Sequence, residues 1–73
     1  MNKMVFFEFS QAIKLDDGTL SHFISSPTIQ DFLTNLQLQR IFGELRYKNG
    51  QLLDKRNFVV AIQHFETDSN LNL

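Results

Sequence analysis

The sequence predicts one small α+β domain, in which a single amphipathic helix packs on an antiparallel or mixed sheet. Three observations predict it: stretches where apolar and polar residues alternate, Asp-Gly and Asn-Gly pairs between such stretches, and one stretch with apolar residues at helical spacing. The expected element order is β-β-α-β-β-β over residues 1–66, followed by a frayed polar tail at residues 67–73. With 42% hydrophobic residues and eight Phe, the 73-residue chain can fill one core without a disulfide.

The first structure expected is a β-hairpin. Apolar side chains occupy nearly every second position over residues 4–15, which is typical of a strand with one buried face. Asp17-Gly18 favours a tight turn because glycine adopts positive φ without strain, and residues 20–25 follow as the return strand. A two-residue loop would fix one register of the two strands, and a bulged loop would shift it.

A helix is expected to begin at Ser26-Pro27-Thr28 and to end near residues 38–40. A Ser or Thr hydroxyl accepts hydrogen bonds from the free N–H groups of the first turn, where proline is also tolerated. The apolar residues follow the i, i+3, i+4, i+7 spacing of one helix face. This stripe consists of Ile29, Phe32, Leu33 and Leu36.

The C-terminal half predicts three strands. Residues 41–48 alternate again, Asn49-Gly50 is the strongest hairpin signal in the chain, and residues 51–54 form a short return strand. Residues 58–65 are β-prone and begin with apolar residues on both parities, which favours a central position in the sheet.

The sequence offers little for catalytic or metal-binding chemistry. Without cysteine, the chain excludes a disulfide scaffold, a thiolate zinc site and a cysteine nucleophile. His22 and His64 lie on different expected strands, and two imidazoles do not complete a zinc site. Asp16-Asp17 falls in an expected turn, where aspartate is common for conformational reasons. We therefore expect a protein that is not an enzyme and has no catalytic residues, no metal and no cofactor.

The expected location is the cytoplasm. The N-terminal residues become polar at Glu8 and Ser10, too early for the apolar region of a signal peptide. No apolar run approaches the length of a membrane span, and the lack of cysteine fits a reducing compartment.

Charge is distributed unevenly around a formal net charge of −1. Residues 40–56 carry five basic and two acidic residues, a net of +3, whereas the rest carries two basic and six acidic residues, a net of −4.

Aromatic residues beside arginine are the usual composition of a protein-binding hot spot. The expected partner-binding residues are Phe6, Phe42, Arg46, Lys48, Lys55 and Arg56. Either the outer sheet face or an open sheet edge would bind the partner, and a core position is the alternative for Phe6 and Phe42.

A single-stranded nucleic acid is the second candidate partner. Phe42, Arg46 and Lys48 share one strand parity, so they would line one surface on which bases stack beside positive charges. The slightly acidic net charge counts against this partner. We therefore expect a protein partner first and a nucleic acid second.

The element order resembles that of the β-grasp family, of which ubiquitin is a member. The resemblance spans residues 4–66 and consists of an N-terminal hairpin, a central helix and later strands around a tight turn. It implies a ubiquitin-like adaptor subunit as a third possible role. Conjugation does not follow from it, because Asn70-Leu71-Asn72-Leu73 lacks the double glycine that conjugation needs.

In its short length, its lack of cysteine and its lack of a catalytic constellation, the chain is also similar to small phage-encoded regulators that bind bacterial RNA polymerase. This similarity implies regulation of transcription, by inhibition of initiation or suppression of termination, through contacts with a polymerase subunit. It assigns no role to an individual residue. The sequence therefore predicts a non-catalytic protein-binding module, with RNA polymerase as the named candidate partner and no membrane.

Overall fold

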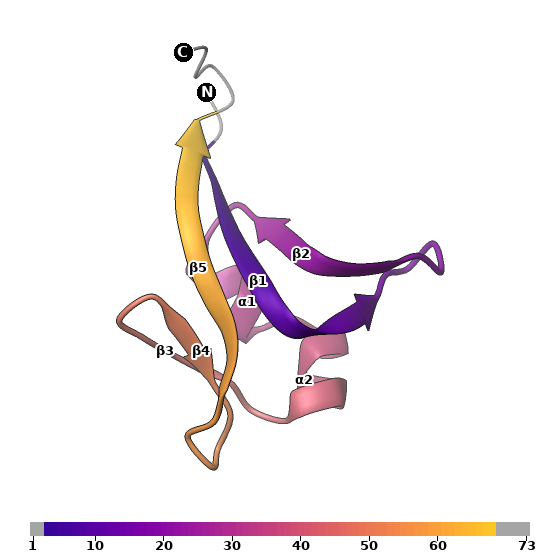
Figure 1. The fold of residues 1–73 in the computed structure, drawn as a ribbon, viewed down its shortest axis with the longest axis vertical. Coiled ribbons are helices and arrows are strands. Elements are labelled where there is room, and N and C mark those ends of the chain that lie inside the picture. The colour runs from indigo at the N-terminus through magenta and orange to yellow at the C-terminus, as the bar shows by residue number, and fades with distance from the viewer. Residues whose placement is uncertain (1–2, 69–73) are drawn as a thin grey trace.

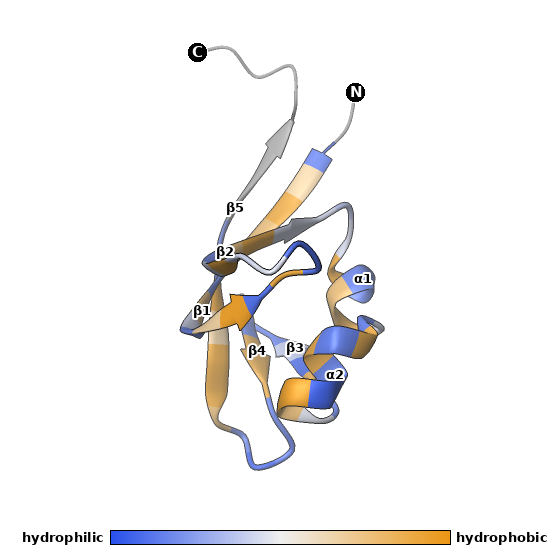
Figure 2. Ribbon diagram, turned by 90° about the vertical axis from the view of Figure 1, so that its right-hand side faces the viewer, coloured by the Kyte–Doolittle hydropathy of each residue, from blue (hydrophilic) through white to orange (hydrophobic). Residues whose placement is uncertain are grey.

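Two short helices and five strands form the computed structural model, which describes residues 3–68 and the side chains of residues 3–64. In chain order the elements are β1 (Lys3–Lys14), β2 (Leu20–Ser26), α1 (Ile29–Leu33), α2 (Leu36–Phe42), β3 (Arg46–Lys48), β4 (Gln51–Leu53) and β5 (Val59–Asp68). The strands form one sheet in the order β2-β1-β5-β4-β3, and all its pairs are antiparallel. Both helices lie on the same side of this sheet (Figures 1 and 2). The expected small α+β domain is present, although the sheet dominates it.

The two longest strands, β1 and β5, lie at the centre of the sheet. The central position expected for the last strand is therefore confirmed. In β1, Phe7 and Phe9 are buried and Glu8 between them is exposed, as the alternation of a strand requires. β5 continues to Asp68, and residues 69–73 of the expected tail lie outside the described residues.

The expectation of one continuous helix is wrong, because two short helices take its place. Thr34 ends α1 and its hydroxyl donates to a carbonyl one turn earlier, while Asn35 begins α2 by accepting from the Leu38 N–H at 2.9 Å. Thr and Asn side chains compete with helical hydrogen bonds in this way, which explains the break. The expected start is confirmed, since Thr28 and Asp31 form a capping box. Neither helix in the described part of the chain has the length or the apolar run that a membrane crossing requires.

The strand expected over residues 41–48 is wrong in its first half. Ile41 and Phe42 complete α2, Gly43 ends it with a φ of +81°, and only Arg46–Lys48 is strand. An apolar-polar alternation of only a few residues fits the last turn of a helix as well as a strand. The pattern over residues 41–45 therefore does not distinguish the two structures. This correction moves Phe42 from the sheet to the helical layer.

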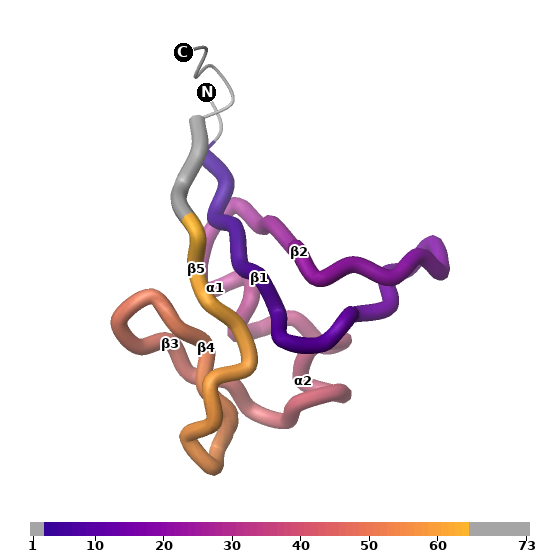
Figure 3. Tube along the Cα trace, in the orientation of Figure 1, coloured from indigo at the N-terminus to yellow at the C-terminus, as the bar shows by residue number. Residues whose placement is uncertain are grey.

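Both expected turns are present. Asn49 and Gly50 connect β3 to β4 with φ values of +50° and +80°, the signs that a type I′ turn requires. The first hairpin has a longer loop, closed by a hydrogen bond of 2.8 Å from the Leu15 N–H to the Thr19 carbonyl. The register of β1 with β2 also shifts between residues 8 and 13. An irregularity of this kind bends a strand, and β1 curves strongly in Figure 3.

The core lies between the helices and the inner face of the sheet. At its centre the rings of Phe7 and Phe32 meet edge-on, with 4.7 Å between their centroids. The largest fully buried side chains are Phe7, Phe9, Phe32, Ile13, Leu38 and Leu52. Because each such side chain contributes about 1.5–3 kcal/mol when it leaves water, this cluster holds both helices on the sheet.

Candidate functional site

The face of the sheet opposite the helices, called the outer face below, carries a row of side chains that crosses all five strands. From β2 across the sheet to β3, the register pairs the members of this row in the order Phe23, Glu8, Ile62, Gln51 and Lys48. The residues before and after Glu8 are buried against the helices. Because side chains alternate along a strand, the row therefore points away from the helices.

The outer face exposes large apolar side chains. Phe23 is 56% exposed, Ile62 is 55% exposed, and Val59 nearby on β5 is 41% exposed. Figure 2 shows both helices on the opposite side, so no described helix covers these residues. Exposed apolar groups with polar neighbours are typical of surfaces that bind other proteins.

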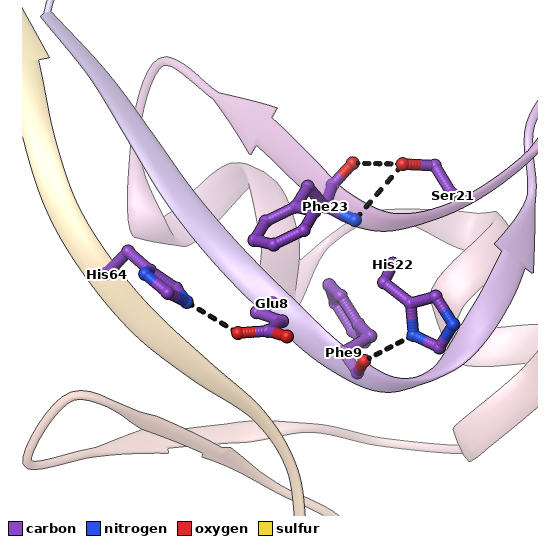
Figure 4. A network of polar contacts seen from close by, with 6 residues as sticks. All are labelled: Glu8, Phe9, Ser21, His22, Phe23 and His64. Atoms are coloured by element: carbon purple, nitrogen blue, oxygen red, sulfur yellow. Dashed lines mark hydrogen bonds and ion pairs between the residues drawn. The ribbon is translucent and has the colours of Figure 1, made fainter.

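Three residues of the outer face contact one another across β2, β1 and β5 (Figure 4). Oε1 of Glu8 lies 2.7 Å from Nε2 of His64, and the His64 ring meets the Phe23 ring edge-on with centroids 5.6 Å apart. The side chains of His64 and Glu8 are 41% and 46% exposed, so their pair contributes less than about 1 kcal/mol to stability. Together with the register of β1 and β2, these contacts place the Phe23 ring beside a carboxylate.

The two histidines are not brought together. Nδ1 of His22 lies 2.9 Å from the carbonyl oxygen of Phe9, where the β1–β2 register shifts, whereas His64 contacts Glu8. Within the described residues, no group of three or more His, Cys, Asp or Glu is placed to hold a metal ion.

Asp17 lies in the loop between β1 and β2 and makes the contacts of a turn residue. The Thr19 hydroxyl donates to Oδ1 of Asp17 at 2.7 Å, and the Thr19 N–H donates to the same oxygen at 3.0 Å. These bonds, the hydroxyl first, lower the pKa of the Asp17 carboxyl below its ordinary value because they stabilise the charged form.

Two shallow hollows meet at Val59 on the outer face. The first, called the apolar hollow, has a volume of about 200 Å³ and is lined by residues 59–62 of β5 and residues 8–10 of β1. The second, called the basic hollow, has a volume of about 490 Å³ and is lined by Val59, Leu53, Arg46, Lys48 and the amide side chains of Asn49, Gln51 and Asn57. The apolar hollow is smaller than the roughly 300 Å³ at which small-molecule sites begin, and it is large enough for one side chain.

Four of the six predicted partner-binding residues are exposed cations, and two of them line the basic hollow. Arg46 and Lys48 line it from β3, and Arg46 donates hydrogen bonds to the Asn57 side chain and the Asp54 carbonyl. Lys55 and Arg56 lie in the neighbouring turn between β4 and β5. There the Arg56 guanidinium lies 4.9 Å from the centre of the Phe58 ring. Strand parity thus predicted the shared face of Arg46 and Lys48.

The two predicted phenylalanines lie in different places. Phe6 is half-buried on the outer face of β1, between two buried neighbours. Phe42 packs against the core, where its ring stacks on the Phe9 ring with centroids 5.8 Å apart. The surface predicted to combine Phe42 with Arg46 and Lys48 is therefore wrong, because Phe42 belongs to α2 and not to a strand.

Sequence reasoning missed the exposed apolar residues of the outer face. Phe23 shares a parity with Ser21 and Ser25 in β2, a signal that places it on the polar side of that strand. For Val59 and Ile62 no such signal exists, because the start of β5 is apolar on both parities.

A comparison of the chain with protein-family models, with curated proteins and with solved structures found no match. These comparisons therefore assign the chain to no family. The candidate site rests on the geometry of the outer face alone.

Proposed function

We propose that this protein is a non-catalytic protein-binding module that binds its partner through the outer face. The observation that supports it best is the position of Phe23 and Ile62, each more than half exposed, in one row on a face that neither helix covers. Large apolar anchors surrounded by polar groups supply most of the binding energy in protein interfaces. Glu8, Gln51 and Lys48 supply the polar groups within the same row.

The outer face is favoured over the sheet edges. At the β2 edge, the Ser21 hydroxyl accepts from the Phe23 N–H at 3.1 Å and donates to the Phe23 carbonyl at 2.8 Å (Figure 4). An added strand would have to displace this hydroxyl. At the β3 edge, Arg46 and Lys48 place charges on a strand of three residues, which disfavours pairing with another strand.

A protein partner is favoured over a single-stranded nucleic acid by the position of one carboxylate. Glu8 lies in the row between the exposed ring of Phe23 and the cations of β3. A phosphate backbone that reached from Lys48 to Phe23 would pass this carboxylate and be repelled by it. The net charge of −1 adds no attraction for nucleic acid.

The test is a pull-down with tagged protein from a nuclease-treated lysate, washed at two salt concentrations. We expect a stoichiometric protein partner that survives both treatments, is lost with Ile62→Glu and is retained with Leu36→Glu. Leu36 is a matched control because it is 72% exposed at the start of α2, on the helical side of the sheet. Equal capture by all three proteins would reject the outer face as the binding surface.

For the partner we propose a subunit of a bacterial RNA polymerase, on the general similarity to small phage-encoded regulators stated above. The same pull-down tests it when repeated with purified polymerase. Binding that depends on Ile62, together with altered initiation or termination in a transcription assay, would support this partner. No binding to purified polymerase would reject it and leave the outer-face proposal in place.

A further inference from the structure

The two hollows of the outer face differ in chemistry and share one wall. Val59 lines both of them. On one side of it lies the apolar hollow with Ile62, and on the other lies the basic hollow with Arg46 and Lys48. An occupant that filled both would therefore need an apolar group and a polar group close together.

The cations of β3 and of the turn between β4 and β5 lack acidic partners. Among the described side chains, no carboxylate lies within ion-pair distance of Arg46, Lys48, Lys55 or Arg56. Asp54, which precedes Lys55 and Arg56 in the sequence, uses Oδ1 to accept from two backbone N–H groups of its own turn, those of Arg56 and Phe58. The positive charge at this end of the outer face is thus available to a partner.

We propose that the outer face recognises an acidic protein segment that carries an apolar anchor. The anchor occupies the apolar hollow beside Ile62, and a carboxylate lies in the basic hollow between Arg46 and Lys48. β3 lies two strands from β5, so the two groups are about 10 Å apart at a strand spacing of ~4.8 Å. In an extended segment this distance corresponds to about three residues. The inference rests on the proposed function and adds the chemistry of its partner.

Glu8 gives the bound segment a direction. Its carboxylate lies at the β1 side of the apolar hollow, opposite the basic hollow, and is held there by His64. An acidic side chain is repelled at the Glu8 end and attracted at the β3 end. The acidic part of the segment therefore points toward β3. A basic side chain at the same position would be repelled by Arg46 and Lys48.

The test is selection of a displayed library of random peptides on three forms of the protein: wild type, Lys48→Glu and Lys14→Glu. Lys48 is exposed and makes none of the hydrogen bonds that hold Arg46, so its replacement leaves the β3–β4 hairpin intact. Lys14→Glu is the matched control, because it makes the same charge change at the far end of β1. The wild type and the control should enrich peptides with Asp or Glu about three residues from an apolar residue. These peptides should bind Lys48→Glu about tenfold more weakly, because one charge-assisted contact is lost.

The outcomes separate this inference from the proposed function. Enriched peptides without acidic residues, or with equal affinity for Lys48→Glu, would reject the acidic partner; loss of their binding with Ile62→Glu would keep the outer face as a binding surface. Peptides insensitive to Ile62→Glu, or no enrichment at all, would reject both. Binding of an oligothymidine probe that competes with the peptides and falls with salt at a log–log slope of about −0.7 per phosphate would assign the cations to nucleic acid instead.

Discussion

The ring of Phe42 lies nearly parallel to the ring of Phe9, with an interplanar angle of 20° and 5.8 Å between the centroids. This stacking attaches the last residue of α2 to the central strand β1. It makes Phe42 a structural residue of the helical layer, although its charge-rich neighbourhood in the sequence suggested an interface.

Replacing Phe42 by alanine should therefore lower the free energy of unfolding by about 2–4 kcal/mol, since a large ring leaves the core boundary. Urea denaturation measures this loss. Leu36→Ala is the control, because Leu36 is largely exposed on the same helix and should change stability by less than about 0.5 kcal/mol. An unchanged midpoint for Phe42→Ala, together with loss of the partner, would return Phe42 to the interface.

Ile62→Glu should leave the fold intact. Ile62 is more than half exposed, so the substitution removes little buried surface, and the cost of glutamate in a strand is about 1 kcal/mol or less. The same change at Ile13, which is 1% exposed, should unfold the domain because it buries a charge. Circular dichroism and thermal melting distinguish the two; unfolding of Ile62→Glu would show that the outer face is covered.

Gly50→Ala should destabilise the β3–β4 hairpin by about 1 kcal/mol. A Cβ at this position would meet no atom within 4 Å, so the cost comes only from the φ of +80°, which alanine adopts poorly. Asn49→Gly, at the other positive φ of the turn, should change the free energy of unfolding by only a few tenths of a kcal/mol. Chemical denaturation of both variants checks the contrast, and equal losses would contradict it.

Stability should fall in acid partly through Asp17. Its pKa is lowered in the folded protein, so its stabilising contribution is present above the unfolded pKa of about 4 and is lost as pH falls through the folded value. Thr19→Ala removes the hydroxyl whose hydrogen bond lowers the Asp17 pKa most. The substitution should therefore raise the Asp17 pKa toward its ordinary value. An NMR titration of the Asp17 carboxyl in both proteins measures the shift, and identical titration curves would refute the assignment.

Ser21→Ala should make the β2 edge prone to pairing with another copy of the chain. The substitution frees the N–H and carbonyl of Phe23, which the Ser21 hydroxyl otherwise satisfies, on a strand without charged residues. Self-association that grows with protein concentration should then appear in light scattering. Ser25→Ala, in the same strand, is the control and should stay monodisperse to the same degree as the wild type; identical scattering from both variants would argue against an edge-protecting hydroxyl.

The strands and turns were largely predictable because they depend on local chemistry. The alternation of residues 4–15 gave β1, and Asn49-Gly50 gave the β3–β4 turn, since few residue pairs adopt two positive φ values readily. Charge and parity also placed Arg46 and Lys48 on one face.

What failed depends on competition between local and long-range interactions. Asn35 interrupts the helix by bonding its side chain to the Leu38 N–H, and the apolar stripe on both sides of it concealed the break. The alternation around Phe42 fits a strand and the last turn of a helix alike, and its contact with the distant ring of Phe9 is not visible in the local pattern. The exposure of Ile62 is decided by which side of β5 the helices cover, and a strand that is apolar on both parities does not encode this locally.

The placement of β5 between β1 and β4 has a consequence for synthesis on the ribosome. The two hairpins β1–β2 and β3–β4 precede β5 in the chain, but the sheet order gives them no shared pairing until β5 lies between them. Without residues 59–68, a nascent chain can form at most two separate hairpins, which are marginally stable alone and whose unpaired sides β5 later occupies. We therefore expect the domain to fold cooperatively only once residues 59–68 are available, and a chain arrested earlier to expose the unpaired edges of β1 and β4.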